Sequence, residues 1–311
     1  MNQYIKINDL PSITSAVQEA IALKSDPYKD KHLGAQKTLV MLFFNASLRT
    51  RLSTEKAAKH LGMDVIVLNV TDAWQLEFES GVVMNLDKSE HVKEAAQVIS
   101  QYADILAVRA FPSLTDKEKD LSEWILSSFE TYATVPIVNM ESATGHPLQA
   151  LADAITIEEL KTKKNPKVVL SWAPHPKVLP HAVANSFIEM MQSIDVDFSI
   201  THPEGYELAS EIVKDTPVIF AQEDALKNAD FVYVKNWSNY KDYGRNTSQD
   251  SNWMMTKEKL GSAQFMHCLP VRRNVVVEDA VLDSDQSVVI AQSNNRTYAA
   301  QLVLKKILEN G

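Results

Sequence analysis

Five consecutive residues, Ser47 to Arg51, combine two hydroxyl side chains with two guanidinium groups. They follow a nearly continuous apolar run, KTLVMLFF, and precede LSTEKAAKHLG, which has the composition of a helix. Ser47 therefore occupies a favourable N-cap position where a strand leads into a helix. A helix N-terminus offers unpaired N–H groups and the positive end of the helix dipole, so it attracts anions. With Arg49, Thr50 and Arg51 added, this turn has the groups to bind a phosphate.

The same turn also fits a simpler interpretation, a capped helix whose arginines pair with surface carboxylates. Each such pair contributes only about 0–1 kcal/mol to the stability of the folded protein. The chain contains neither G-x-x-x-x-G-K-[ST] nor G-x-G-x-x-G, and it has eight glycines in all. The S-x-R-T-R motif alone therefore suggests a phosphate site without deciding between the two.

Three further apolar runs end in polar residues: Arg109 in ILAVRAF; Glu141, His146 and Gln149 in MESATGHPLQ; and His267, Cys268 and Arg272 in FMHCLPVRRN. Each has a structural alternative, namely a salt-bridged arginine, a hydrogen-bonded loop histidine, or a buried cysteine that packs as a small apolar residue. In open parallel sheets, however, ligands bind at the carboxyl ends of the strands. Four such ends with phosphate-compatible groups therefore predict one site for an anionic ligand.

Apolar runs alternate with segments of helical period along the whole chain. In the first half we expect strands at Lys37–Phe44, Met63–Val70, Asp104–Phe111 and Val135–Met140, and helices at Ser47–Leu61, Glu90–Tyr102 and Leu121–Tyr132. In the second half we expect strands at Lys167–Trp172, Val196–Thr201, Pro217–Ala221, Asp230–Val234 and Gln264–Leu269. This alternation predicts an α/β protein of two three-layer α/β/α domains with mainly parallel sheets.

Two helical segments organise the predicted domains. HPLQALADAITIEELK reads as a rigid connecting helix, and NNRTYAAQLVLKKILEN as an amphipathic helix that docks back onto the first half. We therefore expect a first domain of residues 1–146 joined by a helix at 294–311, and a second domain of residues 147–293.

Length and composition limit the class of protein. With 311 residues, 45% of them hydrophobic and 23% charged, the chain has the size of two globular domains. Its net charge of −9 argues against nucleic-acid and anionic membrane partners. The start, MNQYIKINDLPS, lacks the pattern of a signal peptide, and no apolar stretch approaches the roughly 18 residues of a membrane span. The sequence therefore predicts a cytoplasmic protein.

Metal and cofactor chemistry find little support. Cys268 is the single cysteine, which excludes an internal disulfide and a cysteine-cluster metal site. The chain also lacks H-E-x-x-H, and its arginines would supply the positive charge that a metal otherwise provides. We therefore expect no metal and no cofactor.

Together, the segments SLRTR, VRAF, HPLQ and HCLPVRRN resemble the aspartate/ornithine transcarbamoylase superfamily in order and approximate spacing. The resemblance runs from about Lys37 to Arg296, and H-C-L-P with S-x-R-T-R upstream is highly specific. It implies a carbamoyl-phosphate domain, a second domain for the amino acid, and an active site between them. It also implies a homotrimer in which a neighbouring subunit completes each site.

The resemblance further implies roles for matching residues of this chain. It assigns carbamoyl-phosphate binding to Ser47, Leu48, Arg49, Thr50, Trp74, Arg109, His146, Gln149, Cys268, Leu269 and Arg296. The backbone carbonyls of Cys268 and Leu269 would accept hydrogen bonds from the carbamoyl NH2. It assigns catalysis to Arg49, Thr50, Arg109, His146 and Cys268. A neutral amine would attack the carbamoyl carbon, and phosphate would leave with help from an amine proton. Thr50, Arg109 and His146 would stabilise the oxyanion that develops.

The acceptor amine is indicated by a departure from the ornithine enzymes of this family. Those enzymes carry D-x-x-x-S-M-G, whose aspartate meets the α-ammonium of ornithine. This chain has no S-M-G and reads FVYVKNWSNY there, so Lys235 would repel an ammonium and attract a carboxylate. His175 in SWAPHP lies in the same domain. A structural alternative for Lys235 is a surface lysine that snorkels.

These features resemble the acylornithine branch of the family. Its members have a tryptophan matching Trp74, for which an ordinary core aromatic is the structural alternative. They also close a proline-rich segment, here APHPKVLPHAV, into a knotted crossing. Glu141, His175, Lys235, Arg272 and Ser89 form the predicted acylornithine-binding set.

The acyl group is indicated by the loop LDKSEH. Acetyl-preferring relatives carry a glutamate at the position that aligns with Ser89, and succinyl-preferring relatives a small uncharged proline. Serine would not repel a succinyl carboxylate, although aligning Glu90 there instead would reverse the argument. We therefore expect carbamoylation of N-succinylornithine, giving N-succinylcitrulline and phosphate in arginine biosynthesis. N-acetylornithine is the nearest alternative, followed by ornithine and by a silent carbamoyl-phosphate-binding subunit, which would be expected to have lost part of these motifs.

Overall fold

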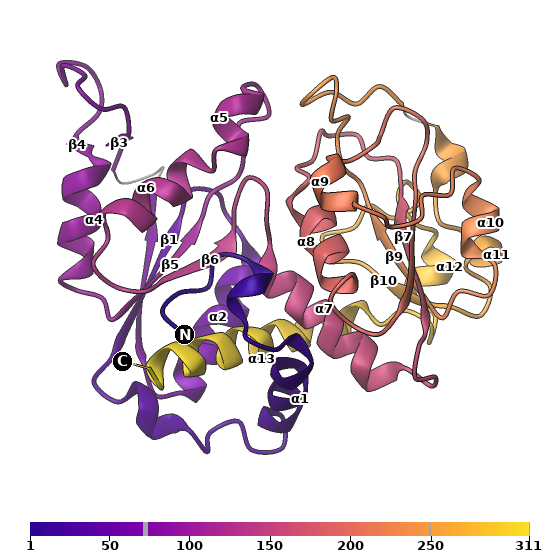
Figure 1. The fold of residues 1–311 in the computed structure, drawn as a ribbon, viewed down its shortest axis with the longest axis horizontal. Coiled ribbons are helices and arrows are strands. Elements are labelled where there is room, and N and C mark those ends of the chain that lie inside the picture. Colours follow the sequence, from indigo (N-terminus) through magenta and orange to yellow (C-terminus); the bar gives the residue numbers. More distant parts are fainter. Residues whose placement is uncertain (71–73, 249, 311) are drawn as a thin grey trace. The chain divides into compact units, whose positions relative to one another are not determined.

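The structure is a computed structural model that describes residues 1–70, 74–248 and 250–310. The chain forms two compact units (Figure 1). Unit 1 comprises Met1–Leu148 with Arg296–Gly311, and unit 2 comprises Gln149–Asn295. The chain passes from one unit to the other within two helices, α7 (Pro147–Leu160) and α13 (Val289–Leu308). The predicted boundaries, after residues 146 and 293, fall two residues before those of the units.

Unit 1 is built on a four-stranded parallel sheet with strand order β2-β1-β5-β6. The strands are β1 (Thr38–Phe43), β2 (Asp64–Asn69), β5 (Ile105–Arg109) and β6 (Ile137–Glu141). Phe43 pairs with both Asn69 and Arg109, and Arg109 pairs with Glu141 across a register shift. All four strands therefore end at the same edge, where the polar residues that follow them gather.

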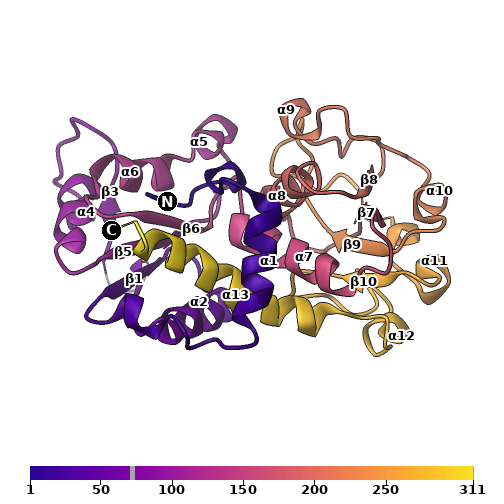
Figure 2. The same cartoon turned by 60° about the horizontal axis from the view of Figure 1, so that its bottom comes forward.

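Helices cover both faces of this sheet. Val40, Leu42, Leu106 and Val108 pack on one face against α4 (Val92–Ser100) and α6 (Trp124–Tyr132). Helix α2 (Leu48–His60) and α13 lie on the opposite face (Figures 1 and 2). The smaller elements of unit 1 are the 3-10 helices at Ile7–Asp9 and Lys31–Gly34, α1 (Ile13–Leu23), α5 (Lys117–Leu121), and the paired two-residue strands β3 (Leu76–Glu77) and β4 (Glu90–His91).

The second part of α13 packs onto the helices of unit 1 (Figure 2). Gln301 meets the buried His60 of α2, with 2.8 Å between its Oε1 and the ring Nδ1. Lys306 pairs with Glu19 of α1 at 2.8 Å. Leu302 and Val303 are fully buried between these polar contacts, and burying a side chain of this size contributes about 1.5–3 kcal/mol.

Unit 2 repeats the design with strand order β10-β9-β7-β8, again all parallel. Its strands are β7 (Lys167–Trp172), β8 (Asp197–Thr201), β9 (Phe231–Lys235) and β10 (Gln264–Met266). Its helices are α8 (Ala182–Met191), α9 (Ser210–Val213), α10 (Gln222–Leu226), α11 (Lys257–Leu260), α12 (Asp279–Leu282) and a 3-10 turn at Ser251–Trp253.

The two faces of the second sheet have different covers. Val169, Val232 and Phe265 pack in one apolar cluster with residues of α10, α11 and α12. On the other face Phe187 of α8 meets Tyr233, with ring centroids 4.2 Å apart. Two mainly parallel sheets flanked by helices confirm the predicted fold class. In the described part of the chain, every helix is too short or too polar to cross a lipid bilayer.

One predicted strand, Pro217–Ala221, is wrong. It forms only an isolated bridge between Ile200 and Val218. Ile219 N donates to Ile200 O, and Ile200 N donates to Pro217 O, both at 2.9 Å. Because the chain enters α10 at Gln222, no further ladder forms.

The helix predicted at Leu121–Tyr132 is divided. It corresponds to α5, which ends at Leu121, and α6, which begins at Trp124. Glu123 lies at the break in a left-handed conformation with φ of 53°. Helix α8, which follows the proline-rich segment, and helix α1 are not among the predicted elements.

Candidate active site

The turn that opens α2 has the predicted cap. Ser47 is the N-cap, with extended backbone, and its Oγ accepts a hydrogen bond from Thr50 N at 3.3 Å. No acidic residue lies in the first turn. The Thr50 side chain is buried, and its Oγ1 accepts a hydrogen bond from Arg296 Nη2 at 2.6 Å. Leu48, by contrast, is 66% exposed, so a ligand at this turn would meet its backbone rather than a buried side chain.

Arg109 ties the end of β5 to this turn. Its Nη1 donates to the carbonyl oxygens of Asn45 and Ala46, at 2.6 and 3.0 Å, in the loop just before α2. Its Nε and Nη2 donate to one oxygen of Glu141, at 3.2 and 3.0 Å. Arg109 is only 5% exposed, and a buried charge is tolerable only when it is paired and hydrogen-bonded.

His146 joins the same cluster as a neutral base. Its Nε2 lies 3.5 Å from Glu141 Oε2 and 3.5 Å from Arg296 Nη2. Burial, and then the charges of Arg296 and Arg109, hold the pKa of His146 well below its usual value of 6.5. A guanidinium can only donate, so Nε2 faces Arg296 as an acceptor. The ring is therefore a neutral hydrogen-bonding group near pH 7 rather than a cation.

These residues form one cluster from five parts of unit 1: α2, β5, β6, the segment after β6, and α13. Thr50, Arg109, Glu141, His146 and Arg296 are each at most 8% exposed. Two guanidinium groups and a helix N-terminus converge there with a single carboxylate. Such a cluster can bind a multiply charged anion and stabilise negative charge that develops during a reaction.

Two acidic residues near the α5–α6 break hold the loops that carry this cluster. The Glu123 carboxylate accepts from Ser142 Oγ at 2.7 Å, Ala143 N at 3.0 Å and Thr144 N at 2.7 Å. Asp120 accepts from the backbone N–H groups of the loop that follows β5, at 2.8 Å each. Neither residue is among those predicted from the sequence. Their only signal was a pair of acids three apart in KEKDLSEW.

Glu141 lies in this cluster, bonded to Arg109 of the neighbouring strand. The sequence predicts Glu141 in the acylornithine-binding set, most of which lies in unit 2. That assignment stays a prediction. In the structure, the Glu141 carboxylate accepts hydrogen bonds from Arg109 of unit 1 and orients its guanidinium.

Unit 2 gathers three of the predicted acylornithine-binding residues. Burial lowers the pKa of His175, and the positive charges of Lys235 and Arg272 lower it further. A backbone hydrogen bond with Lys177 acts in the opposite direction. Lys235 is buried at the end of β9, where its Nζ donates to Asn236 O at 2.9 Å. His175 follows β7, and Arg272 follows β10 and is exposed. This cluster is positively charged, which suits a ligand with carboxylates.

The H-C-L-P motif forms a turn directly after β10. Leu269 has a left-handed backbone with φ of 55°, and its peptide bond to Pro270 is cis. Leu269 N donates to Nδ1 of the buried His267 at 2.8 Å. Gln149, in the first turn of α7, is also buried in unit 2, and its Nε2 donates to Asp153 Oδ1 at 2.7 Å.

Trp74 and Ser89 lie in the segment of unit 1 that follows β2. The Trp74 indole Nε1 donates to Glu90 Oε2 at 2.8 Å, and Trp74 lines an apolar cavity of about 580 Å³ with residues of β2 and α4. Ser89 is exposed and its N–H donates to Gln75 O at 3.1 Å. Glu90 is therefore engaged by Trp74, and Ser89 is the more accessible of the two neighbours.

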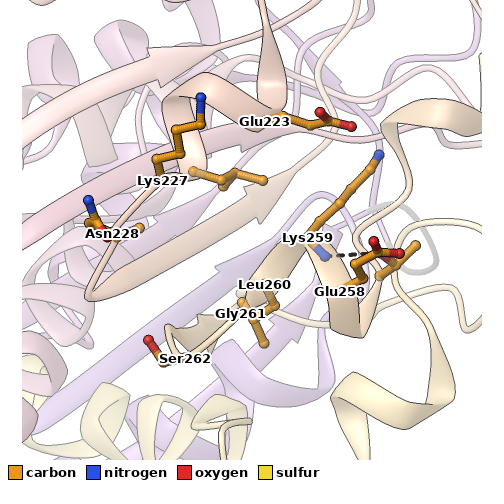
Figure 3. Close-up of a pocket in the computed structure, with 11 residues that line it drawn as sticks. Glu223, Lys227, Asn228, Glu258, Lys259, Leu260, Gly261 and Ser262 are labelled. Atoms are coloured by element: carbon orange, nitrogen blue, oxygen red, sulfur yellow. Dashed lines mark hydrogen bonds between the residues drawn. The ribbon is translucent and has the colours of Figure 1, made fainter.

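A second cavity of about 580 Å³ lies between α10 and α11 of unit 2 (Figure 3). It is lined by polar residues that include Glu223, Lys227, Glu258 and Lys259. Its other walls, 228–229 and 260–262, immediately precede β9 and β10. This cavity is therefore at the amino ends of the strands, whereas ligands of such sheets bind at the carboxyl ends. No predicted site residue lines it. In the described ranges, no three His, Cys, Asp or Glu side chains are placed to share a metal ion.

Most residues of both clusters lie within matches to known families. Residues 2–159 match the aspartate/ornithine carbamoyltransferase carbamoyl-P binding domain. Residues 180–307 match the aspartate/ornithine carbamoyltransferase Asp/Orn binding domain. The first match contains the Arg109 cluster apart from Arg296, and the second contains Lys235 and the H-C-L-P turn.

Individual relatives match along almost the entire chain. N-succinylornithine carbamoyltransferase of Bacteroides thetaiotaomicron is 49% identical over 315 residues, which cover 99% of either chain. N-acetylornithine carbamoyltransferase of Xanthomonas axonopodis pv. citri is 34% identical and covers 92% of this chain and 91% of its own. A solved structure of a glutamate-to-serine mutant of N-acetyl-L-ornithine transcarbamylase, complexed with carbamyl phosphate and N-succinyl-L-norvaline, is 32% identical with a TM-score of 0.91, covering 99% of this chain and all of its own.

The order of motifs, the two parallel sheets and the buried arginine cluster at the α2 N-terminus thus agree with both matches. The chain belongs to the aspartate/ornithine carbamoyltransferase family.

Proposed function

We propose that this carbamoyltransferase moves the carbamoyl group of carbamoyl phosphate to the δ-amine of N-succinyl-L-ornithine. The products are N-succinyl-L-citrulline and phosphate, and the reaction serves arginine biosynthesis. The observation that carries the proposal is the buried cluster of Thr50, Arg109, His146 and Arg296 at the N-terminus of α2. It has the charge for a phosphate and the donors for an oxyanion.

The phosphate end of the ligand would bind at the α2 turn. Ser47, Leu48, Arg49 and Thr50 offer backbone N–H groups, hydroxyls and a guanidinium at the positive end of the helix dipole. Arg109 is already held against the preceding loop by two carbonyl contacts. Hydrogen bonds to charged groups contribute roughly 1.5–3 kcal/mol each, so several of them suit an anion as highly charged as carbamoyl phosphate.

The reaction needs charge stabilisation more than an acid or base. The neutral δ-amine attacks the carbamoyl carbon, the new C–N bond forms, and the C–O bond to phosphate breaks. The amine proton leaves with the phosphate. Thr50, Arg109 and His146 stabilise the oxyanion of the tetrahedral intermediate, and Glu141 orients Arg109. Preorganised donors of this kind usually make the largest single contribution to rate.

The carbamoyl amino group would bind to acceptors of unit 2. Gln149 offers its amide oxygen, and Cys268 and Leu269 offer backbone carbonyls. The buried His267 braces this turn through its contact with Leu269 N. The amino group has two donors and no charge, so neutral acceptors suit it.

The acceptor amino acid would bind at the positive cluster of His175, Lys235 and Arg272. N-succinylornithine has two carboxylates and no α-ammonium, so it fits such a cluster better than ornithine does. Ser89 is small, neutral and exposed, and it cannot repel the succinyl carboxylate. The mutant relative complexed with N-succinyl-L-norvaline has a serine in place of a glutamate, which supports the importance of a small neutral residue.

Assembly would complete the site. We propose a cytoplasmic homotrimer in which the segment with Trp74 and Ser89 reaches a neighbouring subunit. Support comes from its exposed apolar residues, since Val83 is 77% and Leu86 is 86% exposed. Exposed apolar side chains in one loop mark an interaction surface.

The deciding experiment is kcat/KM with carbamoyl phosphate and N-succinylornithine, N-acetylornithine or ornithine. We expect the order succinyl, then acetyl, with free ornithine a poor substrate. A preference for N-acetylornithine would overturn the succinyl proposal, and efficient use of ornithine would overturn the acylornithine assignment. No turnover with any amine, together with binding of carbamoyl phosphate, would favour the silent subunit.

A further inference from the structure

A buried carboxylate of unit 2 has no part in the chemistry proposed so far. Asp153 lies on α7, one turn after Gln149, and is fully buried. Its Oδ1 accepts two hydrogen bonds at 2.7 Å, one from Gln149 Nε2 and one from Gln292 Nε2 of α13. A buried carboxylate between two glutamine amides is costly to desolvate, which makes Asp153 a candidate for a function beyond packing.

The contacts continue from Gln292 to the H-C-L-P turn. Gln292 Oε1 accepts from His267 N at 3.0 Å. His267 Nδ1 in turn accepts from Leu269 N at 2.8 Å. Asp153, Gln292 and His267 are at most 5% exposed. One buried chain of hydrogen bonds therefore runs from Gln149, through Asp153 and Gln292, to the turn that contains Cys268 and Leu269.

The direction of each bond follows from the chemistry of the groups. A carboxylate only accepts, so both glutamine amides must turn their NH2 groups toward Asp153. The oxygen of Gln149 is thereby directed away from Asp153. That Oε1 is buried and accepts no hydrogen bond from any described residue. An unpaired buried acceptor is unfavourable, and it fits a site whose donor comes with the ligand.

We propose that Asp153 is the positioning residue for every acceptor of the carbamoyl amino group. It acts on Gln149 Oε1 directly and on the carbonyls of Cys268 and Leu269 through Gln292 and His267. This inference rests on the proposed function, which supplies the ligand. Its consequence is selectivity for NH2 over a methyl group, because acceptors fixed in this way would be left unpaired against a methyl.

The probes are carbamoyl phosphate, acetyl phosphate and inorganic phosphate. The first two differ chiefly in NH2 against CH3, and the third lacks the group that unit 2 would bind. Equilibrium binding of each is measured on the full-length protein as wild type, Asp153→Asn and Gln292→Met. Asparagine can donate as well as accept, so Gln149 is no longer held in one orientation. Methionine has the length of glutamine but cannot continue the chain of hydrogen bonds to His267.

Asp153→Asn should weaken the binding of carbamoyl phosphate by about 10- to 100-fold, as expected for the loss of one or two oriented hydrogen bonds. Acetyl phosphate and inorganic phosphate should bind as before. Gln292→Met should have a smaller effect in the same direction. The matched control is Thr156→Val, since Thr156 is equally buried on α7 and contacts Asn295 of α13 but not Gln149. It should leave the ratio of carbamoyl to acetyl phosphate affinity unchanged.

The outcomes separate the two proposals. A wild type that binds no carbamoyl phosphate would overturn the proposed function. A wild type that prefers carbamoyl phosphate, with an unchanged preference in Asp153→Asn, would overturn the positioning role alone. Equal weakening of all three probes would also overturn it, because it would mean structural damage only. If Asp153→Asn does not fold, Gln292→Met decides by the same ratio.

Discussion

The two polar clusters of this protein are built differently. In unit 1 the residues proposed to act on the phosphate and the oxyanion are almost wholly buried, and carboxylates hold them or their loops in place. In unit 2 the residues proposed to meet the acceptor include an exposed arginine and a half-buried histidine. The unit 1 cluster is thus a buried network of paired charges, whereas the unit 2 cluster leaves part of its positive charge accessible.

Removing one guanidinium from unit 1 should have the largest effect. Arg49→Ala should lower kcat/KM by about 10² to 10³, the usual loss for one donor to a developing charge. The fold should remain intact, because Arg49 is only half-buried. Steady-state kinetics with N-succinylornithine provide the measurement. Lys56→Ala, which removes an exposed positive charge from the same helix, should stay near wild type. An active Arg49→Ala enzyme would remove Arg49 from the site.

A change at the accessible Ser89 should alter the acceptor rather than the chemistry. Ser89→Glu should reduce kcat/KM for N-succinylornithine by about 100-fold, since like charges in a closed site cost several kcal/mol. N-acetylornithine, which lacks the second carboxylate, should be much less affected. Ser89→Gln is the matched control because it adds the bulk without the charge. Equal losses for both substrates in Ser89→Glu would mean that Ser89 does not face the acyl group.

The supporting carboxylate of unit 1 offers a sharper test of the buried network. Glu123→Ala should lower the free energy of unfolding by about 1–3 kcal/mol, since several donors of the 142–144 loop lose their acceptor. It should also lower kcat by about tenfold, because misplacing His146 weakens oxyanion stabilisation. Denaturant unfolding and kinetics measure the two effects. Glu118→Ala, at an exposed site on α5, should change neither.

The smallest effect concerns pH and stability. The pKa of His146 in the folded protein lies well below 6.5, so below pH 6.5 the unfolded chain binds the proton more readily. The contribution of the neutral His146 ring to the free energy of unfolding is complete above about pH 6.5, and it is lost as the pH falls toward the pKa of His146 in the folded protein. Wild-type stability should therefore decline on acidification more steeply than that of His146→Asn. His175 and His202, whose pKa values are also lowered, contribute equally to both proteins and cancel in the difference. Parallel curves would mean that His146 is not held neutral.

Local sequence patterns predicted the parts of the site that depend on local structure. The cap at Ser47 requires only a strand, a hydroxyl and a helix in succession, and it is confirmed. The pairing of Arg109 with Glu141 was missed because it depends on β5 and β6 being neighbours in the sheet. Strand order is not encoded in periodicity. The contact of Glu141 with Arg109 therefore becomes visible only in the folded sheet.

Longer-range contacts lay further beyond the sequence. Asp120 lies in α5, and Glu123 lies at the break between α5 and α6. The break depends on the left-handed backbone of Glu123, and a glutamate in a sequence gives little sign of that conformation. The contacts of Asp153 with Gln292 span 139 positions. The false strand at Pro217–Ala221 has the right composition, but the next helix begins before a second bridge can form.

The bond between Arg296 and Thr50 joins residues 246 positions apart, with the whole of unit 2 between them. On the ribosome, the whole of unit 2 is therefore made between the two parts of unit 1. Unit 2 is one continuous segment of the chain, and it is made while Thr50 still lacks its partner Arg296. Domains that fold during synthesis usually fold one after another from the N-terminus. Here the sequence of unit 2 lies inside that of unit 1, so unit 1 cannot be finished first. A chain that stops before Arg296 would have every other residue of the unit 1 cluster and still lack the guanidinium that closes it. Translation itself thus delays completion of the unit 1 cluster until unit 2 has been made.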